Sequence, residues 1–434
     1  MQKITSLAKR RGFVFQGSEI YGGLANTWDY GPLGARMLQN IRNLWWEQFV
    51  DQSDNTYPVE SGIIKSPKVW EASGHTESFA DPLVECKKCH HRFRDDHVKG
   101  DKCPDCSGEL TEARQFNMMF KTFVGVVEEK ANTVYLRPET AQGMFVNFKN
   151  ILTTERPTLP FGVAQIGKAF RNEITPGNFI FRTLEFEQME IEYFVQPENW
   201  EESFEEWKKL MWQWLVGLGV NEKKMKWRAH KKDELSHYSK RTEDIEFEFP
   251  WGWGELYGLA YRGDFDLKNH SEKSGEDLQY EDPKTSKRFF PHVVEPTFGL
   301  NRTLLTLLVD AYSEDKERKV LKLSPKVAPY KVAVFPLVAN KNDIVRKARE
   351  IHKVLSSEFA AAWDDRGNIG KRYFAQDEIG TPWCITVDHQ TLEDDQVTIR
   401  DRDTAKQERV AVDKLSDWFH NKLSLFSFEN GLNK

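Results

Sequence analysis

Arg171, Arg182 and Phe186 lie within one short segment, FRNEITPGNFIFRTLEF at 170–186. The planar fork of an arginine pairs well with phosphate oxygens, and an aromatic ring can stack on a base. Together these side chains predict a site for a polyphosphate nucleotide. An ordinary hairpin with solvent-exposed arginines is the alternative that the segment alone leaves open.

The segment predicts a β-hairpin, because apolar and β-favouring residues flank a tip of Pro176, Gly177 and Asn178. Side chains alternate between the two faces of a strand, so Arg171 and Glu173 are expected on one face of the first strand. The second strand is expected to present, on one face, Arg182, Leu184, Phe186, Gln188 and Glu190. From Arg182 to Phe186 such a strand spans about 13 Å, enough to reach from the far phosphate to the base of a bent nucleotide.

A second anion-binding segment is EPTFGLNR, residues 295–302. Glu295 is expected to end a strand, Gly299 permits a close backbone approach, and Arg302 falls in the first turn of the next helix. A cation there opposes the helix dipole, which indicates an anionic ligand; a plain surface arginine is the alternative. The sequence has no G-x-x-x-x-G-K-[ST] loop, so the usual phosphate loop is not used.

Four of the five cysteines form two C-x-x-C pairs, Cys86/Cys89 and Cys103/Cys106. Four thiolates complete the tetrahedral shell that zinc prefers, which predicts a structural Zn²⁺ site rather than a catalytic one. Three histidines nearby are surface residues or alternative ligands: His90, His91 and His97.

Apolar spacing predicts two long helices. Residues 34–50 carry one apolar face, and residues 199–216 carry a stripe rich in tryptophan. The members of the first face are Leu38, Ile41, Trp45 and Phe49, and those of the second are Trp200, Phe204, Trp207, Met211 and Trp214.

A charged segment at 313–329, ending in a proline-containing linker, predicts a domain boundary. Beyond it β and α patterns alternate, as in an α/β domain with a mostly parallel or mixed sheet. The expected domains are 1–325, with a cysteine-bearing module at 84–110 and a helical insertion at 199–245, and 329–434.

The 434 residues are 39% hydrophobic, which is ample for a large core. Apolar stretches are far shorter than the ~20 residues of a membrane span, and no apolar run follows the basic N-terminus. We therefore expect no membrane association, no signal peptide and a cytoplasmic location. The net charge of −6 argues against a wholly basic surface but allows a local patch that binds nucleic acid.

In combination these segments resemble the class II aminoacyl-tRNA synthetases, and among them the homodimeric type of glycyl-tRNA synthetase. The helix at 34–50 followed by a strand and Pro67 resembles the first motif of the class, FRNE with Arg182 and Phe186 the second, and FGLNR the third. Further segments resemble glycine-specific ones: WDYGPLGA (28–35), PKVWEASGH (67–75), LRPETAQG (136–143), FEQMEIEYF (186–194) and ELYGLAYRGDFDL (255–267).

The resemblance covers nearly the whole chain. It implies an α+β catalytic domain on an antiparallel sheet of six or seven strands, with a small inserted zinc module. It also implies a C-terminal α/β anticodon-binding domain and a homodimer.

The resemblance implies an ATP site with Mg²⁺. Arg171 would clamp the α-phosphate and the carboxylate of glycine, while Arg182 and Arg302 would hold the γ-phosphate. Phe186 would stack on adenine opposite Arg302, Glu173 would recognise the adenine amino group, and Glu255 would help to hold magnesium. The implied ATP set is Arg171, Asn172, Glu173, Phe181, Arg182, Thr183, Phe186, Glu255, Leu256, Gly299 and Arg302.

Glycine has no side chain to grip, so its pocket can only bind the ammonium and carboxylate groups and exclude anything larger. By resemblance Glu139, Glu190 and Glu295 surround the ammonium group, and Thr297 lies near the α-carbon. The implied glycine set is Arg94, Glu139, Phe186, Glu187, Gln188, Met189, Glu190, Glu295, Thr297 and Gly299, with Arg262 as a further candidate. Steric exclusion of larger amino acids makes an editing domain unnecessary.

The implied reaction is ATP-dependent ligation of glycine to tRNA(Gly) through glycyl-adenylate. The alternatives are a synthetase of the same subclass for another small amino acid and a non-catalytic nucleic-acid-binding relative. By resemblance, Leu184 stands where many relatives have arginine and Gly177 where some do, which leaves one auxiliary contact open. The helix at 199–216 could pack inside the subunit or touch tRNA.

Overall fold

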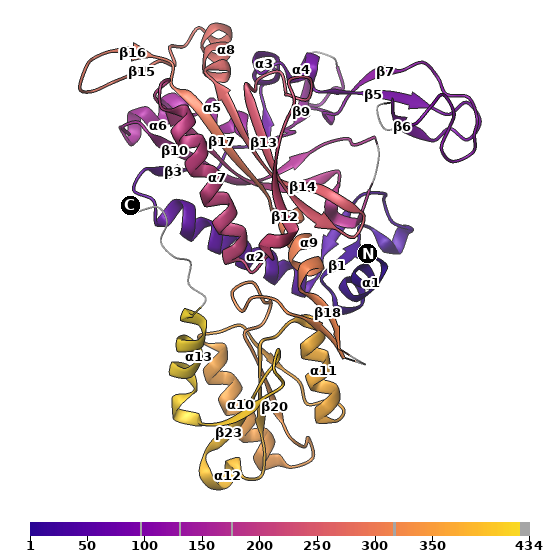
Figure 1. Ribbon diagram of the computed structural model, residues 1–434, viewed down its shortest axis with the longest axis vertical. Helices are drawn as coiled ribbons and strands as arrows, with labels where there is room; N and C mark the ends of the chain where they lie inside the picture. Colours follow the sequence, from indigo (N-terminus) through magenta and orange to yellow (C-terminus); the bar gives the residue numbers. More distant parts are fainter. Residues whose placement is uncertain (96–97, 130–131, 175–176, 316–317, 426–434) are drawn as a thin grey trace.

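The computed structural model describes residues 1–95, 98–129, 132–174, 177–315 and 318–425. Figure 1 shows a large N-terminal part and, below it, a smaller C-terminal part drawn in orange to yellow. Within the described ranges, no helix combines the length and the apolar character needed to cross a membrane.

Seven of the described strands form the central sheet of the large part, in the order β12-β13-β14-β17-β11-β10-β3. Neighbouring strands are antiparallel except β3, which is parallel to β10. Their bounds are β3 (Thr56–Pro58), β10 (Phe161–Phe170), β11 (Glu185–Val195), β12 (Met225–Ala229), β13 (Arg241–Phe249), β14 (Gly252–Gly263) and β17 (His292–Gly299). The expected antiparallel sheet is confirmed, but the segment 199–245 is not purely helical, because it supplies β12 and the start of β13.

One face of this sheet packs against three helices: α2 (Pro32–Trp46), α7 (Trp200–Gly217) and α9 (Leu300–Ala311). Both apolar faces expected from the sequence enter this core, where Trp45 and Trp214 are fully buried. The indole Nε1 of Trp214 donates to Tyr257 Oη at 3.2 Å. The stripe of α7 therefore packs inside the chain.

The opposite face of the sheet carries a second apolar cluster. It joins β10 and β11 to three short helices: α5 (Ala141–Phe145), α6 (Phe148–Thr154) and α8 (Phe265–Ser274). In β11 the residue that enters this cluster is Phe194, which alternation places on the same face as Glu190 and Glu192.

Strands β10 and β11 form the expected hairpin, with Phe170 opposite Glu185. Residues 171–174 and 177–184 lie outside the ladder and belong to the link between the two strands, and the second range includes a 3₁₀ turn at Phe179–Phe181. Arg171 and Glu173 therefore follow the first strand instead of lying on it as expected. Arg182 and Leu184 precede the second strand and do not share the expected strand face with Phe186. Pro176, expected at the tip, lies outside the described residues.

The cysteine module is a small sheet of β5 (Ala80–Glu85), β6 (Arg92–Arg94) and β7 (Arg114–Asn117) that projects from the large part in Figure 1. The remaining elements of the large part are short. They are α1 (Gln2–Arg11), β1 (Val14–Gln16), β2 (Trp28–Tyr30), β4 (Ile64–Lys65), α3 (Pro67–Ala72), α4 (His75–Ser78), β8 (Lys121–Phe123), β9 (Thr133–Leu136), β15 (Tyr280–Glu281), β16 (Arg288–Phe289), β18 (Tyr312–Asp315) and β19 (Arg318–Leu321).

Five described strands form the sheet of the C-terminal part, in the order β21-β20-β22-β23-β24. The first three are parallel and the last two antiparallel, which confirms the mixed sheet. The strands are β20 (Val332–Pro336), β21 (Ala361–Trp363), β22 (Trp383–Val387), β23 (Gln396–Asp401) and β24 (Gln407–Ala411), with helices α10 (Asn342–Ser356), α11 (Ile369–Ile379), α12 (Thr391–Asp394) and α13 (Leu415–Ser424). Strand β24 and helix α12 were not predicted from the sequence.

Candidate active site

A cavity of about 290 Å³ lies on the sheet face opposite the tryptophan-bearing helices. Strands β11, β13, β14 and β17 supply its walls, together with the link between β10 and β11 and the first turn of α9. The predicted site residues that line it are Glu139, Arg171, Glu173, Phe181, Arg182, Thr183, Phe186, Glu187, Gln188, Glu190, Glu255, Leu256, Glu295, Thr297, Gly299 and Arg302. Residues far apart in the sequence are thus brought to one place.

Arg302 lies in the first turn of α9, as the sequence predicts, and two backbone carbonyls hold it there. Its Nε donates to the carbonyl of Phe181 at 3.2 Å, and its Nη1 donates to the carbonyl of Glu255 at 2.9 Å. The guanidinium lies 4.4 Å from the ring centroid of Phe181. The surrounding protein atoms would tolerate a side chain at Gly299, because an added Cβ would lie 3.6 Å from Arg302 Cβ, an ordinary van der Waals contact.

Arg171 follows β10 directly, and its Nε donates to the carbonyl of Pro138 at 3.0 Å. Its guanidinium lies 5.2 Å from the ring centroid of Phe186 on the neighbouring strand and 5.3 Å from that of Phe79. Because one carbonyl and two rings position this side chain, it enters the cavity with a defined orientation.

Arg182 and Glu173 both lie in the link, and Nε of Arg182 is 3.9 Å from a carboxylate oxygen of Glu173. The side chain of Arg182 is 29% exposed and that of Arg302 is 22% exposed, so a ligand can reach both. The charge of Arg302, and to a smaller extent that of Arg171, lowers the pKa of Glu255. Arg171, Arg182 and Arg302 therefore lie in one part of the cavity, which we call the arginine region.

The other end of the cavity is acidic and mostly buried. Thr297 Oγ1 donates to Glu190 Oε1 at 2.8 Å, and the hydroxyl of Thr140 donates to the other oxygen of Glu190. The Glu295 carboxylate accepts from Arg262 Nη1 at 2.7 Å. Arg262 contributes from behind this wall and is itself fully buried.

Burial raises the pKa of Glu190 and raises that of Glu295 well above the usual range. Burial would raise the pKa of Glu139 too, but the charge and hydrogen bond of His75, with help from Arg262, outweigh it and lower the pKa. The Glu139 carboxylate lies 3.2 Å from His75 Nε2. This end of the cavity suits a small cation that carries several N–H donors.

Four predicted residues do not line the cavity: Arg262, described above, and the three that follow. Met189 alternates with Gln188 and Glu190, so its side chain enters the hydrophobic core on the opposite face of the sheet. Arg94 lies on β6 and donates to Asp81 at 2.8 Å. Asn172 donates its backbone N–H to the carbonyl of Met118 at 2.8 Å.

The wall formed by β13 and by the link between β12 and β13 was not predicted from the sequence. His230 and Asp244 line the cavity, with Nε2 of His230 2.6 Å from Oδ2 of Asp244. Burial is the main reason that the pKa of Asp244 rises to about 6. The period-2 pattern of Thr242 and Asp244 was a usable signal, but this segment was expected to be helical.

Leu184 and Gly177 lie outside the cavity lining. Leu184 ties the link to the rest of the chain through its backbone, because its N–H donates to the carbonyl of Asn26 at 3.1 Å. A Cβ added at Gly177 would meet no atom within 4 Å, so this position has space around it.

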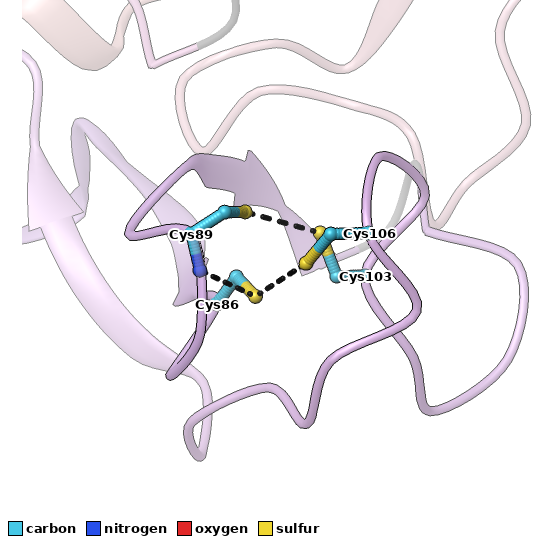
Figure 2. A group of neighbouring side chains, drawn as sticks. All are labelled: Cys86, Cys89, Cys103 and Cys106. Atoms are coloured by element: carbon cyan, nitrogen blue, oxygen red, sulfur yellow. Dashed lines mark hydrogen bonds between the residues drawn. The ribbon is translucent and has the colours of Figure 1, made fainter.

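The four cysteines of the module converge on one point, as Figure 2 shows. Sγ of Cys86 lies 3.4 Å from Sγ of Cys106, and Sγ of Cys89 lies 3.6 Å from Sγ of Cys103. Zinc–sulfur bonds of tetrahedral geometry give sulfur–sulfur distances of about 3.8 Å, so the four thiols fit a tetrahedral metal ion. A backbone N–H from Cys89 is the main reason that the pKa of Cys86 falls to about 6.

The histidines near the module have other contacts. His91 Nδ1 lies 2.6 Å from Asp105, and His90 Nδ1 lies 3.5 Å from Glu85. His97 lies outside the described residues.

Two family models match the chain. Residues 121–312 match the tRNA synthetase class II core domain (G, H, P, S and T), and residues 331–422 match an anticodon binding domain. The first match contains most of the cavity, and the second coincides with the C-terminal sheet and its helices.

Curated relatives match over nearly the full length. The glycine–tRNA ligases of Alkaliphilus oremlandii and Caldanaerobacter subterraneus subsp. tengcongensis are each 50% identical, covering 98% of this chain and 98% of their own. That of Geobacillus thermodenitrificans is 49% identical with the same coverage. With its class II core, its anticodon-binding fold and this similarity along the whole chain, the protein belongs to the glycine–tRNA ligase family of class II aminoacyl-tRNA synthetases.

Proposed function

We propose that this chain joins glycine to tRNA(Gly) in two steps through glycyl-adenylate. The cavity carries the proposal, because arginines from separate elements meet in one region of it and buried carboxylates form another. In the first step a carboxylate oxygen of glycine attacks the α-phosphorus of ATP, the bond to the bridging oxygen breaks, and pyrophosphate leaves. In the second step the terminal ribose 3′-hydroxyl of the tRNA attacks the carbonyl carbon of the adenylate, and AMP leaves.

The arginine region suits ATP. Arg171 would hold the α-phosphate and the glycine carboxylate together, while Arg182 and Arg302 would hold the γ-phosphate. Phe186 would supply a stacking surface for adenine. Positioning and charge stabilisation of this kind need no nucleophile from the protein.

Magnesium is a fitting partner at Glu255. Its carboxylate lines the cavity, and the charge of Arg302 lowers its pKa, so it is ionised at neutral pH and offers the oxygen ligand that Mg²⁺ prefers. The cation would neutralise charge on the phosphates.

The acidic region suits the ammonium group of glycine. Glu139, Glu190 and Glu295 would accept its N–H donors, and Thr297, held by Glu190, would lie close to the α-carbon. A larger amino acid would have to place its side chain against these buried groups, which is the physical basis of the proposed selectivity.

Further parts of the proposal concern the rest of the molecule. The Cys₄ cluster would hold a structural Zn²⁺, and the C-terminal part would bind the anticodon region of the tRNA, in the cytoplasm. Ile20 is 89% exposed and Tyr21 is 86% exposed in the segment that precedes α2. Exposed apolar side chains of this size support a homodimer in which a second copy covers them.

The test is ATP–pyrophosphate exchange measured with each of the twenty amino acids in turn. Glycine alone should support fast exchange. Exchange with serine, threonine or proline but not glycine would assign a different synthetase of the subclass. Nucleic-acid binding without any exchange would favour the non-catalytic relative, which the presence of Arg171, Arg182 and Arg302 in one cavity argues against.

A further inference from the structure

A carboxyl group without an assigned role lies directly behind the acidic region of the cavity. Glu192, on β11, is fully buried, and neither of its carboxyl oxygens has a hydrogen-bond partner among the described residues. An ionised carboxylate in such a place would lose its hydration without compensation. The protonated form is therefore the one that this position favours.

Glu192 belongs to a cluster of three carboxyl groups. Strand alternation places it on the same face as Glu190, and Glu295 lies on the neighbouring strand β17. Each of the three offers an oxygen atom within 4.8 Å of the others. Like charges this close in a buried site cannot all ionise, so the cluster shares protons as a unit.

The arginine closest to this cluster already forms ion pairs with other carboxylates. Arg262 pairs with Asp266 at 2.7 Å and with Glu295 at 2.7 Å, and it lies 3.7 Å from Glu139. Burial lowers the pKa of His270, so this histidine is neutral at pH 7. Titratable and charged groups on the surrounding elements are Glu139, Arg137, His75, Tyr238, Arg262, Asp266, His270 and Glu295.

Burial also raises the pKa of Glu190 and raises that of Glu192 and Glu295 well above the usual range, and the negative charge of neighbouring carboxyl groups adds to each of these shifts. This agrees with the geometry. The carboxyl groups Glu139, Glu190, Glu192, Asp266 and Glu295 outnumber the nearby arginines Arg137 and Arg262.

We propose that Glu192 keeps a proton in the empty pocket, and that this proton passes to solvent when the ammonium group of glycine enters beside Glu190 and Glu295. The incoming positive charge favours the ionised forms of the cluster, so the O–H bond of the carboxyl group breaks and the buffer takes up the proton. Glycine keeps its own ammonium protons. Glu192 does not line the cavity, so it is a positioning residue that acts through its two neighbours.

The inference rests on the proposed glycine-binding function and is tested on the full chain. Isothermal titration of glycine near pH 7, in buffers of different ionisation enthalpy, should show release of about one proton per glycine bound. In Glu192→Gln, which fixes the neutral form, the released proton should disappear, and the KM for glycine should rise about tenfold while that for ATP stays constant.

The matched control is Glu243→Gln. Glu243 is also buried, but it lies 2.8 Å from Lys208 and 2.5 Å from Arg241, and these contacts lower its pKa, so it carries no proton to release. This variant should keep the wild-type proton count.

Two results would overturn the inference: a wild-type heat of binding that does not depend on the buffer, or an unchanged proton count in Glu192→Gln. The first of these measurements uses the wild-type protein, so it does not depend on whether a variant folds. ATP–pyrophosphate exchange assays on the same samples distinguish a failure of the proposed proton release from a failure of the proposed function. Glycine-dependent exchange without proton release removes the inference alone, whereas neither binding nor exchange with glycine removes the proposed function with it.

Discussion

At the scale of single residues, Arg171 makes the sharpest prediction. It lies where the arginine region and the stacking surface of Phe186 meet, and the carbonyl of Pro138 fixes its orientation. Arg171→Ala should lower glycine-dependent ATP–pyrophosphate exchange by about 10²-fold or more, because it removes charge stabilisation at the reacting phosphate.

The circular dichroism spectrum and melting temperature of this variant should stay near those of the wild type. Arg346→Ala, an arginine whose side chain is 73% exposed on α10, serves as the control and should exchange normally. Near-normal exchange in Arg171→Ala would refute its assigned role.

The arginines could be proposed as a phosphate site from the sequence because their side-chain chemistry is specific, whereas the carboxylates were expected at the site only from the resemblance to a known family. The alternation of β11 already separated Met189 from Gln188 and Glu190, and it placed Glu192 with them. The state of Glu192 could not be predicted, since it depends on Glu295 and Arg262, which reach it from other strands.

At the scale of elements, the two faces of β11 have different roles: one faces the active-site cavity, and the other packs in the hydrophobic core. Met189 belongs to the core face, so Met189→Ala should create a cavity and destabilise the large part by about 2–5 kcal/mol, seen as a lower urea midpoint. Met189→Leu conserves volume and should change the midpoint little. Both variants should keep the wild-type KM for glycine; a rise in KM without loss of stability would return Met189 to the glycine site.

The helices at 34–50 and 199–216 were predictable because apolar spacing is a local property of the sequence. The path of the link between β10 and β11 was not predictable from the sequence. Its backbone is held by residues far away in the chain, such as Asn26 and Met118, whose carbonyls accept from Leu184 and Asn172. The 3₁₀ turn and the position of Arg182 follow from those contacts.

The cysteine module makes a prediction about metal. We expect about one zinc ion per chain by elemental analysis, because four thiols lie close enough to one another to bind a single tetrahedral ion. Cys103→Ser should lower the zinc content and make the module the first site of limited proteolysis. Cys384→Ser is the control, since Cys384 is buried in β22, away from the module, and this variant should retain zinc. Equal zinc loss in both variants would contradict the assignment.

At the scale of the whole molecule, direct contacts hold the two parts together. Arg11 Nε donates to Glu378 at 2.6 Å, and Arg10 Nη2 donates to the same carboxylate at 3.0 Å. The guanidinium of Arg36 lies 5.0 Å from the ring centroid of Tyr330. A tRNA bound to both parts would thus meet a joined surface rather than two separate ones.

A groove of about 540 Å³ runs between the two parts, and Arg10, Arg11 and Arg36 line it from the N-terminal side. Arg366 lines it from the C-terminal side, with a side chain that is 89% exposed. Arginines facing each other across a groove favour a phosphate backbone, so Arg366→Glu should raise the KM for tRNA in aminoacylation severalfold and flatten its dependence on salt.

ATP–pyrophosphate exchange, which needs no tRNA, should be unchanged in Arg366→Glu because the active-site cavity is formed by the large part alone. Arg346→Glu reverses the charge of another exposed arginine of the C-terminal part, one that does not line the groove. If this control raised the KM for tRNA as much as Arg366→Glu, the effect would come from the net charge of the C-terminal part, and the groove would lose its place in tRNA binding.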